Sequence, residues 1–527
     1  MLNICKIKWL KKINRGKLII LSKNYFMVEI LDTTLRDGEQ TAGVSFNSHE
    51  KLAIARKLLD DINVDRVEVA SARVSSGELD AFKKICSWAE DVGQIDRVEA
   101  LGFVDNGVSI DWIADAGGKV INLLTKGSLR HVMMQLKKQP EEHLEDIKRN
   151  IDLAKKRGLN VNLYLEDWSN GMISSPDYVF FMLDSLVDFP VDRFMLPDTL
   201  GILSPDKTEN FCKQIVQKYP NKKFDFHAHN DYDMAVANVY AALKAGITGI
   251  HTTVNGLGER AGNAPLASVL GVLNDQLELE NNLNEHRITD ICRFVETFSG
   301  IRIPNNKPIV GESVFTQCSG VHADGDNKAN LYFNRLLPER FGRVRTYALG
   351  KMSGKANINK NLEELGIHLN PEQIKLITKR IIELGDKKEN VTTEDLPFII
   401  SEVLRDGTLI QEKVKIINYS LNLSLGLKPV ATLKISIEGS DYEATSPGDG
   451  QYDAFMKALW KIYDKLGKKH PVLVDYKVSI PPGGKTDALV ETVITWSFNE
   501  QTFHTRGLDA DQIEAAIKAT VKMLNLI

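Results

Sequence analysis

Short apolar runs alternate with amphipathic stretches along the chain from residue 28 to about residue 300. The runs are rich in β-branched residues and predict strands, whereas apolar residues that recur every three or four positions predict helices between them. Two such helical stretches are 48–62 and 140–158, and Gly158 is suited to close the second. The eight predicted strands are 28–34, 65–71, 98–104, 120–126, 160–166, 193–199, 224–230 and 249–255.

Eight strand–helix units in succession predict a closed barrel. Strands that alternate with helices form parallel sheets, and eight of them close into a (β/α)8, or TIM, barrel. We therefore expect an α/β catalytic barrel over 27–300. A doubly wound open sheet is the alternative, and the strand count makes it the weaker one.

The pattern changes after residue 300. The segment 301–408 is mixed, with polar, glycine-rich stretches at 320–330 and 348–358 followed by two helical stretches, and we interpret it as linker subdomains. Residues 409–527 predict a separate α+β domain. Its predicted strands are 413–424, 431–439, 472–480 and 488–498, and its predicted helices are 450–467 and 509–524.

Composition fits a soluble protein of several domains. At 527 residues, with 43% apolar and 26% charged side chains, the chain exceeds what one hydrophobic core supports. A net charge of −4 argues against a nucleic-acid partner, and no apolar run approaches the ~18 residues of a membrane span. The scattered cysteines suggest neither a disulfide framework nor a zinc ribbon, which favours a reducing cytoplasm. They are Cys5, Cys86, Cys212, Cys292 and Cys318.

Residues 1–26 are basic and contain no acid, and the first acidic residue is Glu29. A targeting presequence is one interpretation, but a long apolar segment and a small-residue cleavage site are lacking. We interpret these residues as a disordered extension, or as residues upstream of a start at Met27.

Polar residues gather where the predicted strands end. In a barrel of this kind the carboxyl ends of the strands form one rim, where catalytic groups lie. Strand 224–230 carries the pair His227 and His229, and alternation along a strand points both imidazoles to the same side. With Asp37, after the first strand, they form a two-histidine, one-carboxylate set that suits a divalent metal ion.

An isolated His-x-His is more often a coincidental pair of polar residues. The acid and arginine at another strand end, and the lack of competing thiolates, favour the metal site here. Arg36, next to Asp37, is either part of a surface ion pair or a ligand for a carboxylate or enolate, and we favour the second role. The glycine-containing loop 255–263 lacks the strand–helix setting of a dinucleotide site.

The strings LDTTLRDGEQ (31–40), HAHND (227–231) and NGLGERAGN (255–263) together resemble the 2-isopropylmalate synthase and (R)-citramalate synthase family of the DRE-TIM metallolyase superfamily. The likeness runs from about Met27 to the C-terminus. It includes the linker strings GVHADG and ALGKMSGKANI and a LeuA-type regulatory domain.

The resemblance implies an acyltransferase that condenses acetyl-CoA with a small 2-oxo acid at a divalent metal ion (Mn, Zn, Co or Mg). Asp37, His227, His229 and Asn263 would bind the metal, and Arg36 and Thr199 would hold the carboxylate of the 2-oxo acid. Arg36, Glu166, His322 and Tyr332 would be catalytic, and Asp324, Asn330 and Leu331 would help to bind acetyl-CoA. In the family the linker of one subunit covers the barrel of the other, which implies a homodimer with linker exchange.

Three positions bear on the choice of 2-oxo acid. The strings LGFVDN, NLLTKGS and YLEDWSNG resemble those of citramalate synthases, and they contain Leu101, Leu124 and Tyr164. We expect these side chains to form a tight apolar wall that admits the methyl group of pyruvate and crowds the isopropyl group of 2-oxoisovalerate. Their ordinary role would be barrel core.

Three other activities compete with citramalate synthesis. The first is 2-isopropylmalate synthase, which differs in substrate alone. The second is an acyl-CoA lyase of the same superfamily, which the domain 409–527 disfavours. The third is an inactive barrel kept as an amino-acid sensor, which the intact set of metal and acid–base residues disfavours.

The resemblance also implies an isoleucine site in the C-terminal domain, and hence feedback inhibition by the end product of isoleucine biosynthesis. Tyr452 and Asp453 begin a predicted helix, whose free N–H groups suit the charged end of an amino acid. Dimerisation alone is the simpler role for this domain. The residues matching the isoleucine pocket are Tyr452, Asp453, Leu473, Tyr476, Ile480, Thr486 and Val490.

Overall fold

A computed structural model describes residues 27–386, 391–404, 413–480, 490–499 and 501–527. The extension 1–26 and Thr486 lie outside these residues. The described residues divide into two compact units, 27–315 with Asn334–Val344, and Thr316–Phe333 with those that follow Val344. The segment 301–408 is therefore divided between the two units.

The first unit is a closed barrel of eight parallel strands, in which β1 pairs with both β2 and β8. This confirms the predicted (β/α)8 barrel and excludes the open sheet. The strands are β1 (Glu29–Asp32), β2 (Arg66–Ser71), β3 (Val98–Phe103), β4 (Val120–Lys126), β5 (Asn160–Glu166), β6 (Arg193–Asp198), β7 (Lys223–Ala228) and β8 (Gly249–Thr252).

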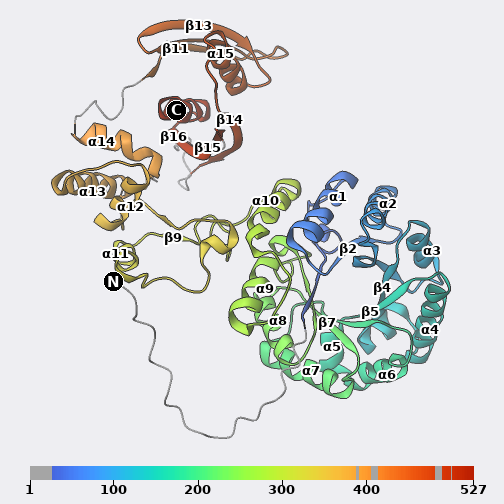
Figure 1. Cartoon of the computed structure of the whole chain (residues 1–527). Coiled ribbons are helices and arrows are strands. Elements are labelled where there is room, and N and C mark those ends of the chain that lie inside the picture. The colour runs from blue at the N-terminus through green and yellow to red at the C-terminus, as the bar shows by residue number, and fades with distance from the viewer. Residues whose placement is uncertain (1–26, 387–390, 405–412, 481–489, 500) are drawn as a thin grey trace, which may run out of the picture. The chain divides into compact units, whose positions relative to one another are not determined.

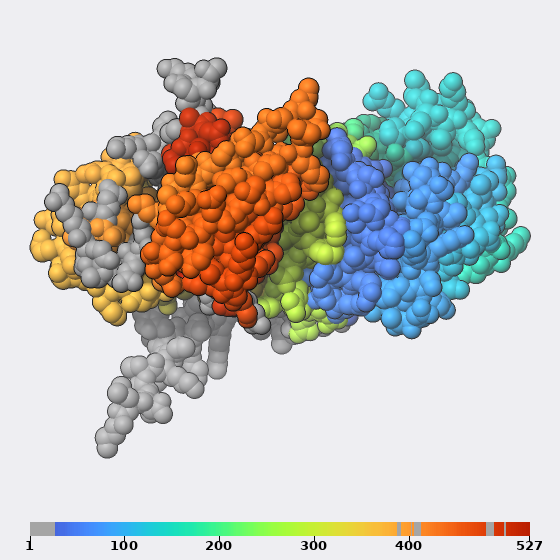
Figure 2. All heavy atoms as spheres, turned by 90° about the horizontal axis from the view of Figure 1, so that it is seen from above, coloured from blue at the N-terminus to red at the C-terminus, as the bar shows by residue number. Residues whose placement is uncertain are grey.

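Helices surround the strands and bury the outer apolar layer of the sheet (Figure 1). In the space-filling view of Figure 2, the side chains of the part of the chain that contains α1 to α4 (blue to cyan) pack side by side at the surface. The helices are α1 (Ser48–Arg56), α2 (Ser76–Asp91), α3 (Val108–Asp115), α4 (Pro140–Lys156), α5 (Trp168–Ser174), α6 (Pro176–Leu186), α7 (Pro205–Lys218), α8 (Ala235–Lys244), α9 (Leu266–Val272) and α10 (Ile288–Ser299).

Charged side chains link the amino-terminal parts of several barrel strands. The buried carboxylate of Asp225 on β7 accepts hydrogen bonds from Arg66 on β2 and Arg193 on β6, both at 2.6 Å. Arg66 also donates to Glu99 on β3 at 2.9 Å. Because a buried charge is costly unless it is paired, these contacts tie the four strands to one relative position.

Gly249 makes room for this ionic layer. It lies beside Asp225 in the register of β7 and β8, and a Cβ atom there would sit 1.9 Å from Asp225 Oδ1. Any side chain at position 249 would displace the carboxylate that the two arginines share.

The second unit contains short linker elements and two three-stranded antiparallel sheets, β11–β12–β13 and β14–β15–β16. Helix α15 packs on β12 and β13, and α16 on β15 and β16, around a common apolar core. The elements are β9 (Thr316–Gln317), α11 (Gly320–Ala329), β10 (Thr346–Tyr347), α12 (Lys355–Glu364), α13 (Pro371–Asp386), α14 (Leu396–Leu404), β11 (Val414–Asn422), β12 (Val430–Ile437), β13 (Ser440–Pro447), α15 (Gln451–Lys465), β14 (Val472–Ser479), β15 (Val490–Phe498), β16 (Gln501–Asp509) and α16 (Gln512–Leu526).

The second unit contains several elements that the sequence analysis did not predict, among them the short strands β9 and β10. The glycine-rich stretch 320–330 forms helix α11, although it contains two glycines. Strands β13 and β16 were not predicted, because most of their residues are polar. Strand β13 follows β12 through the two-residue turn Glu438–Gly439, where both residues have positive φ, as a tight hairpin requires.

Within the described residues, no helix is long and apolar enough to cross a membrane.

Candidate active site

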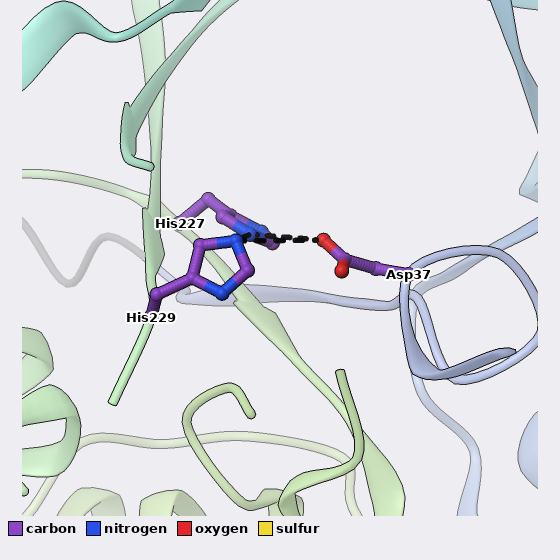
Figure 3. Close-up of side chains that lie close together, drawn as sticks. All are labelled: Asp37, His227 and His229. Atoms are coloured by element: carbon purple, nitrogen blue, oxygen red, sulfur yellow. Dashed lines mark hydrogen bonds and ion pairs between the residues drawn. The ribbon is translucent and has the colours of Figure 1, made fainter. Parts of the chain in front are cut away.

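Two histidines and an aspartate converge at the carboxyl ends of β1 and β7 (Figure 3). Strand β7 ends at Ala228, and His229 continues next to Asn263 in an isolated β-bridge. The side chains of His227 and His229 therefore approach Asp37 together, with their Nε2 atoms 3.1 Å and 4.0 Å from Asp37 Oδ2. All three ligand atoms lie within 4.8 Å of one another.

The electrostatics of this group suit a cation. Burial would raise the pKa of Asp37, but Arg36 and His227 hold it well below its ordinary value. Burial lowers the pKa of His229 to about 4, which keeps the imidazole neutral. Buried Asn263 Oδ1 has no hydrogen-bond partner among the described residues. An ionised carboxylate, two imidazoles and a free amide oxygen are suitable donors, so the group could hold a divalent metal ion.

Arg36 is held by a glutamate that the sequence analysis missed. Its Nη2 lies 2.6 Å from Glu68 Oε2, its Nε donates to the same oxygen at 2.7 Å, and its Nη1 lies 3.2 Å from Asp37 Oδ2. Glu68 is fully buried in the middle of β2 and also accepts a hydrogen bond from Asn122. A single acid between the apolar residues Val67 and Val69 was the available signal, since a buried charge requires a partner.

Leu101, Leu124 and Tyr164 lie together, as the sequence analysis expected of a pocket wall. Leu101 and Tyr164 belong to a small buried cluster with Leu31 and Met195, and Leu124 packs against it. The expected wall is not wholly apolar, because the Tyr164 hydroxyl contacts Arg36 Nη2 at 3.2 Å and His251 Nδ1 at 3.0 Å. Their role in substrate choice stays a prediction.

Glu166 and Thr199 have local partners. Glu166 ends β5 and forms an ion pair with Lys126 at the end of neighbouring β4, a residue that the sequence analysis did not select. The hydroxyl of Thr199 accepts a hydrogen bond from the backbone N–H of Asp167 at 2.9 Å, which leaves its own hydrogen for another acceptor.

The linker residues form a separate group in the second unit. His322 and Tyr332 face each other, with ring centroids 4.1 Å apart. Asp324 pairs with Lys328 at 2.6 Å on the exposed side of α11. Asn330 ends that helix in a left-handed conformation, and exposed Leu331 follows it. Helix α11, which was not predicted, contains His322, and the chain after its end brings the Tyr332 ring against the imidazole.

Two of the expected isoleucine-site residues are in contact. The rings of Tyr452 and Tyr476 lie 5.4 Å apart, and the Tyr452 hydroxyl is 2.7 Å from Thr520 Oγ1. A β-bulge between Leu473 and Asp475 puts Leu473 and Tyr476 on the same face of β14, opposite Trp496 and Ile494 of β15.

The remaining expected residues of this site lie nearby in the chain. Ile480 is exposed just after β14, and Val490 begins β15. Asp453 accepts a hydrogen bond from the backbone N–H of Asp449 and pairs with Lys457, so its carboxylate already has partners.

Residues 27–295 match the family model HMGL-like. The chain belongs to the HMGL-like family. Members of this family use a divalent metal ion, and the group of Asp37, His227 and His229 is where this chain could hold one. Residues 309–389 match the homocitrate synthase post-HMGL domain-like model, and residues 390–527 match the LeuA allosteric (dimerisation) domain.

Full-length relatives carry two different names. The (R)-citramalate synthase CimA of Methanocaldococcus jannaschii is 33% identical over 95% of this chain and 99% of its own length. The 2-isopropylmalate synthase of the same organism is 34% identical over 95% of this chain and 94% of its own length. The 2-isopropylmalate synthase of Oceanobacillus iheyensis is 32% identical over 94% of this chain and 96% of its own length. This HMGL-like chain is accordingly an enzyme of the acyltransferase type.

We expect the purified protein to bind a divalent ion through His227, and His227→Ala to lose it. Mn²⁺ should raise the thermal unfolding midpoint of the wild type by mass action and leave that of His227→Ala unchanged. Metal content by mass spectrometry and a thermal scan measure both effects. His49→Ala, at an exposed histidine on α1, is the control and should behave as wild type. Unchanged metal content in His227→Ala would place the ion elsewhere.

Proposed function

We propose that this enzyme condenses acetyl-CoA with pyruvate and hydrolyses the thioester to give (R)-citramalate and CoA. Condensation of acetyl-CoA with a 2-oxo acid fits the relatives' names. The choice of pyruvate is supported by one observation, the packing of Leu101, Leu124 and Tyr164 into the cluster next to Arg36. A ring and two leucines leave less space for an isopropyl group than for a methyl group.

A second candidate is 2-isopropylmalate synthase, which would take 2-oxoisovalerate instead. The relatives favour it as much as they favour citramalate synthesis, because two enzymes of one organism with these names match this chain at 33% and 34% identity. Overall sequence identity therefore does not distinguish the two activities, and the side chains of the pocket must do so.

The proposed reaction distributes its steps over the residues of the rim and the linker. Arg36 and Thr199 bind the carboxylate of pyruvate, and a divalent ion held by Asp37 and the two histidines would polarise its ketone. His322 removes a proton from the acetyl methyl group, and that carbon attacks the ketone carbon. Glu166 and Tyr332 remain to protonate the new alkoxide and to orient the water that releases CoA.

The linker residues are proposed to act on the barrel of a second subunit. Large apolar side chains are exposed in the segments that follow six of the barrel strands, and the proposed interface would cover them. These residues are Val74, Val108, Met134, Ile173, Leu200 and Tyr232. The segment 316–333 exposes Val321, Leu331 and Phe333, which are chemically suited to cover such a surface. A homodimer with exchanged linkers would bring His322 to the partner's rim.

Isoleucine is the proposed inhibitor, with its side chain between Tyr476 and Leu473 and its charged end near the first turn of α15. This proposal is supported by the contact of Tyr452 with Tyr476 and by the match to the LeuA allosteric domain. The free N–H groups of the first helical turn would bind the carboxylate of the amino acid. The Asp453 carboxylate, which would suit the ammonium group, is already paired with Lys457.

Pyruvate should have at least about a tenfold higher kcat/KM than 2-oxoisovalerate, because a crowded pocket rejects a larger group. Leu124→Ala should raise the relative activity with 2-oxoisovalerate. Leu123→Ala is the matched control, because the neighbouring Leu123 side chain packs in the large apolar core cluster of the barrel and not in the pocket cluster. CoA release with each acid in parallel measures this, and a preference for 2-oxoisovalerate would establish the second candidate instead.

His322→Asn should lower kcat by roughly 10²–10⁴-fold with little change in the KM for pyruvate, as loss of a general base does. Steady-state kinetics with both substrates measure the two effects. His368→Asn, at an exposed histidine of the same unit, serves as the control. A His322→Asn enzyme with nearly normal kcat would assign the base to another residue, with Glu166 the next candidate.

Isoleucine should inhibit more strongly than leucine, and Tyr476→Ala should weaken inhibition by isoleucine about tenfold, within the ~1–3 kcal/mol of a typical allosteric coupling. Initial rates in titrations with each amino acid test this. Leu425→Ala, at an exposed turn between β11 and β12, should retain the inhibition of the wild type. Stronger inhibition by leucine would argue against both the pocket and citramalate synthesis.

A further inference from the structure

His251 lies in the middle of a hydrogen-bonded chain inside the barrel, and the proposed reaction does not use it. The residue belongs to β8 and is buried. Its Nε2 is 3.2 Å from Asp225 Oδ2, and its Nδ1 is 3.0 Å from the Tyr164 hydroxyl. One imidazole thus joins the ionic layer near the amino ends of the strands to the wall of the proposed pocket.

The partners of His251 determine which ring nitrogen carries the proton. Burial opposes ionisation of Asp225, but Arg66 and Arg193 hold its pKa well below the ordinary value, so its oxygens are acceptors alone. The facing Nε2 of His251 must therefore be the donor. A neutral ring that carries its proton on Nε2 offers its Nδ1 as an acceptor to the Tyr164 hydroxyl.

The Tyr164 hydroxyl then donates to His251 and accepts from Arg36. Burial, with Glu68 nearby, raises the pKa of Tyr164 well above its ordinary value, so the phenol keeps its proton. Glu68 Oε2 is a more distant acceptor at 3.4 Å and already accepts from Arg36 and Thr33. With the hydrogen pointing to His251, the phenol oxygen faces Arg36 Nη2 at 3.2 Å.

We propose that His251 is a positioning residue that fixes the Tyr164 ring and thereby sets the largest 2-oxo acid that the pocket accepts. The ring is held at its hydroxyl by His251 and Arg36 and at its sides by Leu101 and Met195. A wall anchored in this way cannot rotate aside for a branched substituent. The inference rests on the proposed condensation and adds to it the residue that keeps the wall in place.

The test is the ratio of kcat/KM for pyruvate to kcat/KM for 2-oxoisovalerate in variants of His251. His251→Met removes both hydrogen bonds and should shift the ratio about tenfold toward 2-oxoisovalerate. His251→Gln can donate to Asp225 and accept from Tyr164 through its amide, and should keep the wild-type ratio. A purely structural role would make the two variants lose activity with both acids alike, and an unchanged ratio in folded His251→Met would overturn the proposal.

A double-mutant cycle shows whether His251 acts through the hydroxyl. Tyr164→Phe removes the contacts of the hydroxyl with both His251 and Arg36 and should shift the ratio by at least the same factor. Adding His251→Met to it should cause no further shift, since the hydroxyl through which His251 acts is then absent. If the two substitutions shifted the ratio independently, so that their factors multiplied in the double variant, the proposal would be overturned. The imidazole ¹⁵N resonances of His251, assigned by comparison with His251→Gln, should show a proton on Nε2. A proton on Nδ1 would reverse the chain and also overturn it.

These measurements separate the inference from the proposed function. The wild-type ratio alone decides between pyruvate and 2-oxoisovalerate as substrate. The shift of that ratio in His251→Met tests the positioning role whichever acid is preferred, because a loosened wall favours the larger acid in both cases.

Discussion

The pairing of buried charges inside the barrel is the constraint on which the site depends. Asp225 accepts from Arg66 and Arg193, and Arg66 also reaches Glu99, so four strands are tied together through buried partners. Breaking one buried pair is costly because the other charge remains desolvated. Gly249 leaves space for the shared carboxylate. The result is a rigid base from which the side chains nearer the carboxyl ends of the strands are positioned.

The same principle extends toward the rim. Glu68 holds Arg36, and Arg36 lies against Asp37, so the carboxylate that faces the two histidines is fixed by a chain of ion pairs and not by its own flexible loop alone. Lys51 adds a second restraint, because its buried ammonium contacts the backbone oxygen of Leu35 and the carboxylates of Glu39 and Glu78. A donor set held in this way is preorganised for a cation, which lowers the cost of ordering the ligands when the ion binds.

The spacing of residues along the sequence predicted part of this arrangement but not the contacts between distant strands. The bounds of β4 and β5 agree with the predicted 120–126 and 160–166, because short runs of β-branched and apolar residues are typical of buried parallel strands. The histidine pair was visible because the two residues lie two positions apart at the end of one predicted strand. Glu68 and His251 were missed, since a lone polar residue in an apolar strand does not say which distant strand supplies its partner. Helix α11 was missed because Gly320 and Gly325 lower helix propensity, whereas tertiary packing decides.

Overall sequence identity and substrate choice depend on different parts of such an enzyme. Identities of 33% and 34% over 95% of this chain do not separate a citramalate synthase from an isopropylmalate synthase. Substrate choice depends on a few side chains on one inner face, and a difference of one or two methyl groups in the substrate corresponds to only about 1–3 kcal/mol. The side chains of a pocket can supply that free-energy difference only if they do not move aside for the larger substrate. In the proposed pocket, the hydrogen bonds of the Tyr164 hydroxyl would therefore matter as much as the size of its ring, because a mobile ring of the same volume would not exclude the larger acid.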